Sequence, residues 1–218
     1  MKWSVAMIKI FQQFMIISCI LIMSGCVKIT VPITPPVELI VSPISPPSTF
    51  DEVLLYMKSP SADERLLGMW AVLNYPDKNQ ATLPFVVQNL YYQQNSDVRS
   101  AAARVLGELG PVANMAVPDL INVLQTDSSS DVQIDIAIAL GKIDDLSAVP
   151  ALASNLIGYE DNNIAAFSAK SISQLTGETF PDSDSSGFRL DEHGVPLIVI
   201  AARDWWLSTG QFEDWNKK

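Results

Sequence analysis

The sequence has few of the residues that bind metals or act as nucleophiles. Its 218 residues include one histidine, His193, and two cysteines, Cys19 and Cys26. So small a set excludes a zinc site of the usual histidine and cysteine composition. A Ser/His/Asp triad would have to use His193, but no G-x-S-x-G turn is present, nor is a phosphate loop or dinucleotide fingerprint. We therefore expect a protein that is not an enzyme and that holds no cofactor.

Basic residues are also scarce. Fourteen Lys and Arg stand against 24 Asp and Glu, which gives a formal net charge of −10. A body of this charge repels nucleic acid and anionic lipid surfaces, so we expect neither as a partner.

The amino-terminal residues have the pattern of an export signal. Lys2 and Lys9 precede the uncharged apolar run "FMIISCILIM" (14–23), which is too short to span a membrane comfortably. The following "MSGC" (23–26) resembles the bacterial lipobox, with Met23 in place of the usual Leu. The resemblance implies that residues 1–25 are removed as a signal peptide and that Cys26 carries a lipid. The alternative is an uncleaved anchor with an incidental cysteine.

Cleavage before Cys26 would leave an exported acidic protein without a disulfide. Removing residues 1–25 takes away Lys2 and Lys9 and no acid, so the charge becomes −12. The lipid alone would then hold the protein at the membrane, in the cell envelope and outside the cytoplasm. Val27 follows the cysteine where an inner-membrane retention signal often has Asp, which favours the outer membrane if the organism has one.

A proline-rich tether is predicted at residues 26–48. Six of these residues are proline, and each proline fixes φ and removes a backbone donor. The stretch should therefore be extended and stiff. Its alternating Ile and Val leave open a second possibility, a strand added to a partner.

Residues 49–177 repeat at intervals of about 34. Asp63, Asp97 and Asp131 are each 34 apart, and the prolines of the alternate helices, Pro84, Pro118 and Pro150, are 34 and 32 apart. Each unit is predicted to be a pair of helices, the first capped by its Asp and the second carrying Pro in its first turn. One pair cannot bury its own apolar stripe, so the units should stack.

Small residues mark where neighbouring units should approach each other. Ala101, Ala102 and Ala103 lie together in the clearest first helix. Alanines recur in the equivalent helices of the next copies, at positions 137, 139, 165, 166 and 169.

The stretches "DVRSAAARVLGELGP" and "AVPDLINVLQ" resemble the HEAT repeat, most closely the short form of phycobilisome-lyase-type repeat proteins. The resemblance implies an all-α, right-handed solenoid of stacked antiparallel helix pairs. The sequence departs from it at Gln133, where the family often has Arg. Residues 178–218 break the period, and they are predicted to form a polar loop and a capping helix over Val195–Leu207.

A binding face is predicted on the second helices, which line the concave side in HEAT-like arrays. When these helices are aligned on their prolines, the columns Gln88/Asn122/Ser154 and Asn89/Val123/Asn155 point away from the apolar stripe. Tyrosine adds large amphipathic contact area at the helix end. The candidates for binding a protein or peptide are Gln88, Tyr91, Tyr92, Asn122 and Asn155. The alternative is a merely solvated face.

A weak calcium motif lies in "DSDSSG" (182–187). Asp182, Asp184 and Ser186 occupy the first, third and fifth ligand positions, and glycine occupies the sixth. The match then fails, because the twelfth position is His193 rather than the bidentate Glu. A polar connecting loop is the alternative.

The function that these patterns favour is a membrane-anchored, extracytoplasmic protein-binding scaffold without catalysis. Two other functions stay open. One is an envelope protein that binds calcium or cell-wall glycan, with Trp205, Trp206 and Trp215 as a stacking platform. The other is an accessory, lyase-type factor to an enzyme, which the resemblance suggests.

Overall fold

The computed structural model describes residues 44–157, 161–180 and 188–216. The predicted signal peptide, Cys26, most of the tether and the candidate calcium residues Asp182, Asp184 and Ser186 lie outside these residues. Pro43–Lys218 form one compact unit.

The described residues are helical apart from turns and one isolated bridge between Leu190 and Pro196. Short 3-10 turns precede the second helix of each pair. The elements are α2 (Phe50–Tyr56), α3 (Ala62–Val72), η1 (Pro76–Lys78), α4 (Asn79–Leu90), α5 (Ser96–Leu109), η2 (Gly110–Ala116), α6 (Val117–Thr126), α7 (Ser130–Ile143), η3 (Leu146–Ala148), α8 (Val149–Ile157), α9 (Asn162–Thr176), α10 (Leu197–Ser208) and η4 (Gly210–Phe212).

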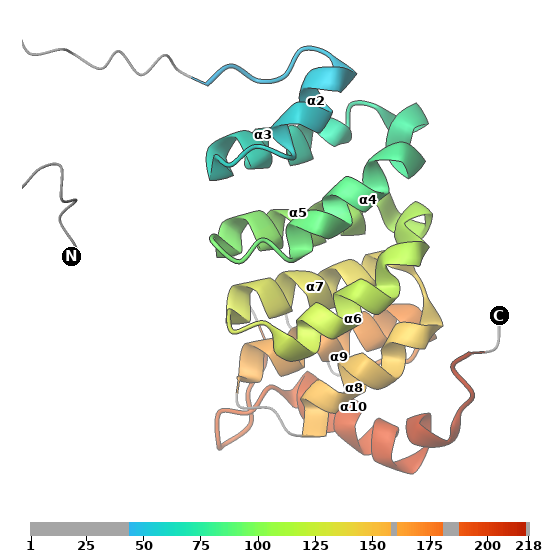
Figure 1. The fold of residues 1–218 in the computed structure, drawn as a ribbon. Helices are drawn as coiled ribbons and strands as arrows, with labels where there is room; N and C mark the ends of the chain where they lie inside the picture. The colour runs from blue at the N-terminus through green and yellow to red at the C-terminus, as the bar shows by residue number, and fades with distance from the viewer. Residues whose placement is uncertain (1–43, 158–160, 181–187, 217–218) are drawn as a thin grey trace, which may run out of the picture. The chain divides into compact units, whose positions relative to one another are not determined.

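The helices form two layers. The first helices α3, α5, α7 and α9 stack in sequence order, and the second helices α4, α6 and α8 lie beside them in a parallel row (Figure 1). Each pair is antiparallel and packs on the next, so the predicted all-α solenoid of stacked helix pairs is confirmed.

The first-helix layer depends on small side chains. Ala101, Ala102 and Ala103 are buried in α5, and so are the alanines predicted in α7 and α9. The backbones come so close that a Cβ added at Gly107 would lie 3.0 Å from the Ala139 Cα. At Gly141 an added Cβ would lie 2.8 Å from the Ser171 Oγ. The prediction that small residues mark the approach of neighbouring copies is therefore correct.

The helix starts differ from the predicted ones. The caps are Ser61, Asn95, Ser129 and Asp161, two residues before the predicted acids in the first three helices. Asp63, Asp97 and Asp131 lie in the first turn instead, where a negative charge suits the helix dipole. Pro118 and Pro150 lie in their first turns as predicted, but α4 begins five residues before Pro84, which is inside the helix.

The carboxy-terminal helix covers the last pair. Helix α10 packs on α9 and α8, as predicted for a cap. Two tryptophans of α10 pack with Trp215, which follows η4: the Trp206 and Trp215 rings are stacked at 6.4 Å, and the Trp215 Nε1 donates to the Gly210 carbonyl at 2.9 Å. Trp205, Trp206 and Trp215 are partly buried against the core, which is the packing role rather than an open sugar-stacking platform.

Candidate functional site

The fourth residue of the first helices α3, α5 and α7 binds the end of the helix before it. The Arg65 Nη1 donates to the Met57 carbonyl at 2.9 Å, and the Arg99 Nη1 donates to the Tyr92 carbonyl at 3.1 Å. In the next copy the Gln133 Nε2 donates to the Leu124 carbonyl at 3.1 Å. The last carbonyls of a helix lack intrahelical donors, so these side chains cap them. Gln133 therefore caps the preceding helix with a side-chain amide in place of a guanidinium.

Arg99 is also the centre of a buried ion pair. Its Nε and Nη2 donate to the two carboxylate oxygens of Asp127 at 2.6 and 2.9 Å, and the two side chains are only 10% and 4% exposed. Asp127 Oδ1 also accepts from the Ser129 backbone N–H at 2.9 Å. Two parallel charge-assisted bonds make this a strong contact, which joins α5 to the residue that follows α6.

The contact between Arg99 and Asp127 shifts the pKa of each side chain in the direction that favours its charged form. Burial alone would raise the pKa of Asp127, but the hydrogen bonds from Arg99 and Ser129 and the nearby guanidinium charge outweigh it and lower that pKa. The hydrogen bond to Asp127 raises the pKa of Arg99 against the opposing effect of burial. The pair is therefore charged throughout the neutral range.

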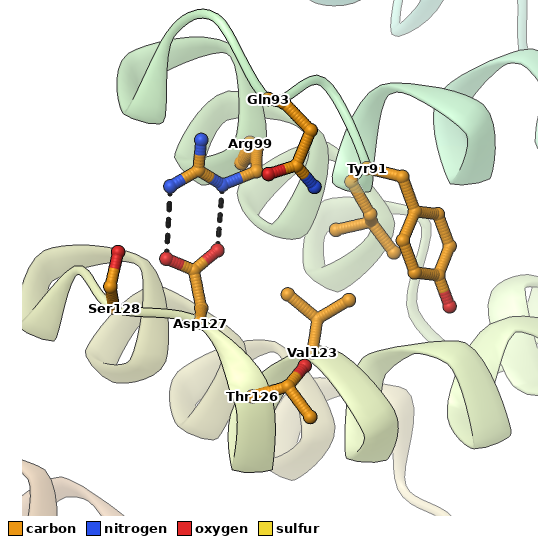
Figure 2. Close-up of a pocket in the computed structure, with 8 residues that line it drawn as sticks. Tyr91, Gln93, Arg99, Val123, Thr126, Asp127 and Ser128 are labelled. Atoms are coloured by element: carbon orange, nitrogen blue, oxygen red, sulfur yellow. Dashed lines mark hydrogen bonds and ion pairs between the residues drawn. The ribbon is translucent and has the colours of Figure 1, made fainter.

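This ion pair forms one side of a small polar pocket at the carboxyl ends of α4 and α6, and Tyr91 stands at the other side (Figure 2). The cavity has a volume of about 120 Å³, well below the ~300–1,000 Å³ of a typical ligand site. It is lined by Leu90, Tyr91, Gln93, Arg99, Val123, Thr126, Asp127 and Ser128. Arg99 is held by its hydrogen bonds to Asp127 and to the Tyr92 carbonyl, so its role is to hold the wall of this pocket in place.

Tyr91 links the two second helices beside the pocket. Its hydroxyl donates to the Asp119 Oδ1 at 2.7 Å and accepts from the Asn122 Nδ2 at 3.4 Å. Burial and the hydrogen bond to Asp119 raise the pKa of Tyr91, with a smaller opposing effect from Asn122. We call the surface carried by the exposed Gln88, Tyr91 and Asn122 and the half-buried Asp119 the α4–α6 face.

Three of the predicted binding residues lie on this face. Gln88 and Asn122 are exposed, and Tyr91 is 39% exposed. Gln88 and Tyr91 are three apart at the end of α4 and so share a side of the helix.

The other two predicted residues are used inside the stack. The Tyr92 hydroxyl donates to the Pro60 carbonyl at 3.0 Å, and the Arg65 guanidinium lies 4.3 Å from the centre of the Tyr92 ring. The Asn155 Nδ2 donates to the Ser168 Oγ at 3.0 Å and is partly buried. Both side chains join neighbouring units of the stack.

The column of Asn89 and Val123 is also buried, contrary to its predicted outward direction. The Asn89 Nδ2 donates to the Met57 carbonyl at 3.1 Å, and its Oδ1 accepts from the Arg65 Nη1 at 2.7 Å. The side chain thus helps to cap α2.

Sequence reasoning missed Asp119 and Asp127. Asp119 stands in a column whose other members are Phe85 and Ala151, so the repeat gives no sign of it. Asp127 meets Arg99 across 28 residues, and only the folded stack brings the two together.

Across the described ranges 44–157, 161–180 and 188–216, no group of three or more His, Cys, Asp or Glu side chains is placed to hold a metal ion. Within the same ranges, no helix has the length and apolar character to cross a membrane.

The fold and this site define a HEAT-like α-solenoid domain. Residues 98–126, which cover α5, η2 and α6 almost completely, match the family model of the PBS lyase HEAT-like repeat. A solved structure, the complex of CpcE and CpcF of phycocyanin lyase from Nostoc sp. PCC7120, is similar to the chain at 22% sequence identity. The match covers 66% of this chain and 71% of that chain, with a TM-score of 0.49. A search of curated proteins found no match to this chain.

These comparisons correct two predictions. A scaffold without catalysis and a protein that is not an enzyme were predicted, whereas residues 98–126 match a family model of lyase type. This match favours the alternative, an accessory lyase-type factor.

Proposed function

We propose that this chain is a lyase-type accessory factor, a HEAT-like subunit that holds a protein while a group is attached to it. The observation that carries the proposal is the match to the PBS lyase HEAT-like repeat over residues 98–126. The same segment includes Asp119 and Asn122, so the lyase-type repeat carries the α6 side of the α4–α6 face.

The groups on this face suit the holding of a protein. Gln88 and Asn122 offer neutral amide donors and acceptors, and Tyr91 offers a flat amphipathic ring. The Arg99–Asp127 pair fixes the loop after α6 and so sets the position of the face. We assign binding and orientation of the protein substrate to this chain, and we expect a second subunit to complete the site.

Reconstitution tests the proposal. Phycocyanin apoprotein and its free chromophore are incubated with this chain alone, with CpcE, or with CpcF. Covalent attachment is measured as visible fluorescence of the protein band after denaturing electrophoresis. We expect attachment when this chain replaces one of the two subunits, at a rate at least tenfold above the reaction that lacks it. Attachment at the background rate in every combination would overturn the proposal.

We further propose that the chain is a bacterial lipoprotein of the cell envelope. The support is the "MSGC" resemblance at residues 23–26, together with the short apolar run before it and the proline-rich residues after it. Cys26 would carry the lipid, and the acidic body would stand outside the cytoplasmic membrane, on the outer membrane if the organism has one.

Cys26→Ser is expected to release the protein from membranes, because a single lipidated cysteine is the proposed anchor and the acidic body does not bind anionic lipid. Cell fractions washed with high salt are probed for the protein, with Cys19→Ser as the matched control. We expect the Cys26 variant to lose membrane retention and the Cys19 variant to keep it. Retention of both variants to the same extent would contradict lipid anchoring.

A further inference from the structure

A second hollow adjoins the α4–α6 face and is apolar. It has a volume of about 290 Å³ and lies between α4 and the η2–α6 junction. Leu83 and Ala116 are buried, and Met115 is 86% exposed. The residues that line it are Gln80, Leu83, Pro84, Val87, Met115 and Ala116.

This hollow and the α4–α6 face form one furrow. On α4, Gln80, Pro84, Val87 and Tyr91 follow one another at intervals of three or four residues, which places them along one side of the helix. On the opposite wall, Met115, Asp119 and Asn122 have the same spacing. The contacts of Tyr91 with Asp119 and Asn122 show that the two rows face each other.

The furrow offers acceptors beside its apolar part. Asp119 is a carboxylate on one wall. On the other wall Pro84 has no N–H, so the Gln80 carbonyl lacks the donor that the fourth following residue normally supplies in a helix. That carbonyl points along the helix toward Pro84, which lines the hollow. The lining residues and the α4–α6 face include one acid and no Lys or Arg.

We infer that this furrow binds a segment of a partner protein that places one large apolar side chain in the hollow and a Lys or Arg beside Asp119. An apolar hollow with a Met on its rim takes up an apolar side chain and adapts to its shape. The adjacent acceptors, in a chain with 24 acidic and 14 basic residues, select a cationic neighbour. The inference rests on the proposed function only in that the occupant is a protein.

Three labelled peptides of twelve residues test whether the furrow binds an apolar side chain with a cationic neighbour. They share a central Phe and differ only in its flanking residues, which are Lys, Ser or Glu. Binding to the full-length chain in nanodiscs of phosphatidylcholine is measured by fluorescence anisotropy. We expect the Lys peptide to bind at least tenfold more tightly than the Glu peptide, with a smaller difference at higher salt.

Two variants locate the binding. Asp119→Lys should reverse the order of the Lys and Glu peptides, whereas Asp204→Lys, the same charge change on α10, should preserve it. Met115→Ser should lower the binding affinity for all three peptides at least fivefold. Its matched control is Leu55→Ser, another exposed apolar residue, which should leave binding unchanged.

Equal affinity for the Lys and Glu peptides would overturn the inference. Identical effects of the two lysine variants would do the same, because they would show attraction by overall charge rather than by the furrow. A dimer of the chain that Met115→Ser dissociates in sedimentation would also overturn it, with a second copy as the occupant. The peptide assays contain no chromophore and are independent of the reconstitution. If the chain prefers the Lys peptide but no chromophore is attached in the reconstitution, the proposed function is contradicted and the furrow inference stands.

Discussion

Asp127→Ala should lower the free energy of unfolding by about 3–5 kcal/mol, since it leaves the Arg99 guanidinium buried without its carboxylate. Urea unfolding followed by circular dichroism measures the change. The double variant Arg99→Met with Asp127→Leu should be less destabilised than Asp127→Ala, because replacing both charges by apolar groups removes the unpaired charge. The exposed pair of Lys142 and Glu108 is the control, where Glu108→Ala should cost less than about 1 kcal/mol.

The same variant should show a defined pH dependence. The pKa of Asp127 is lowered in the folded protein, so its contribution is fully present above the unfolded value of about 3.9. The contribution is lost as the pH falls through the lower, folded pKa. The stability difference between wild type and Asp127→Ala should therefore be constant near neutrality and shrink in acid. A difference of less than 1 kcal/mol at pH 7 would show that the pair does not hold the stack.

Ala102→Leu should destabilise the stack by about 1–3 kcal/mol, because it overpacks a fully buried position where neighbouring first helices approach. Each interface couples two units, so the loss should extend beyond the repeat that carries the change. Hydrogen exchange of the amides in α3 and α7 measures that spread.

Ala81→Leu is the matched control, the same substitution at an exposed position of α4. It should change stability by no more than about 0.5 kcal/mol. Equal melting temperatures for Ala102→Leu and wild type would contradict the packing of first helix on first helix.

The architecture could be predicted from the sequence because its signals are local and repeated. The 34-residue spacing and the alanines report contacts between identical positions of adjacent copies, so each copy supports the assignment of the next. The helix starts were predicted less accurately. Asp63, Asp97 and Asp131 resemble caps in sequence, but Ser61 and Asn95 satisfy the first N–H groups, which leaves the acids in the first turn.

The candidate site was only partly predictable, because its geometry depends on contacts between copies. Gln88 and Asn122 could be identified from their outward columns, since helical periodicity alone decides their direction. Asn89 could not, because its amide is drawn inward by a carbonyl 32 residues earlier. Asp119 has no counterpart in the other copies, and its significance depends on Tyr91 reaching it from α4.

The most direct test is the initial rate of chromophore attachment in the reconstituted reaction when the α4–α6 face is altered. The variant combines Gln88→Ala, Tyr91→Ala and Asn122→Ala, all exposed positions, and circular dichroism confirms its folding. A control variant changes Gln174→Ala and Gln211→Ala, which are exposed near the other end of the stack. We expect a rate at least tenfold below wild type for the face variant and an unchanged rate for the control. A wild-type rate from the folded face variant would contradict it.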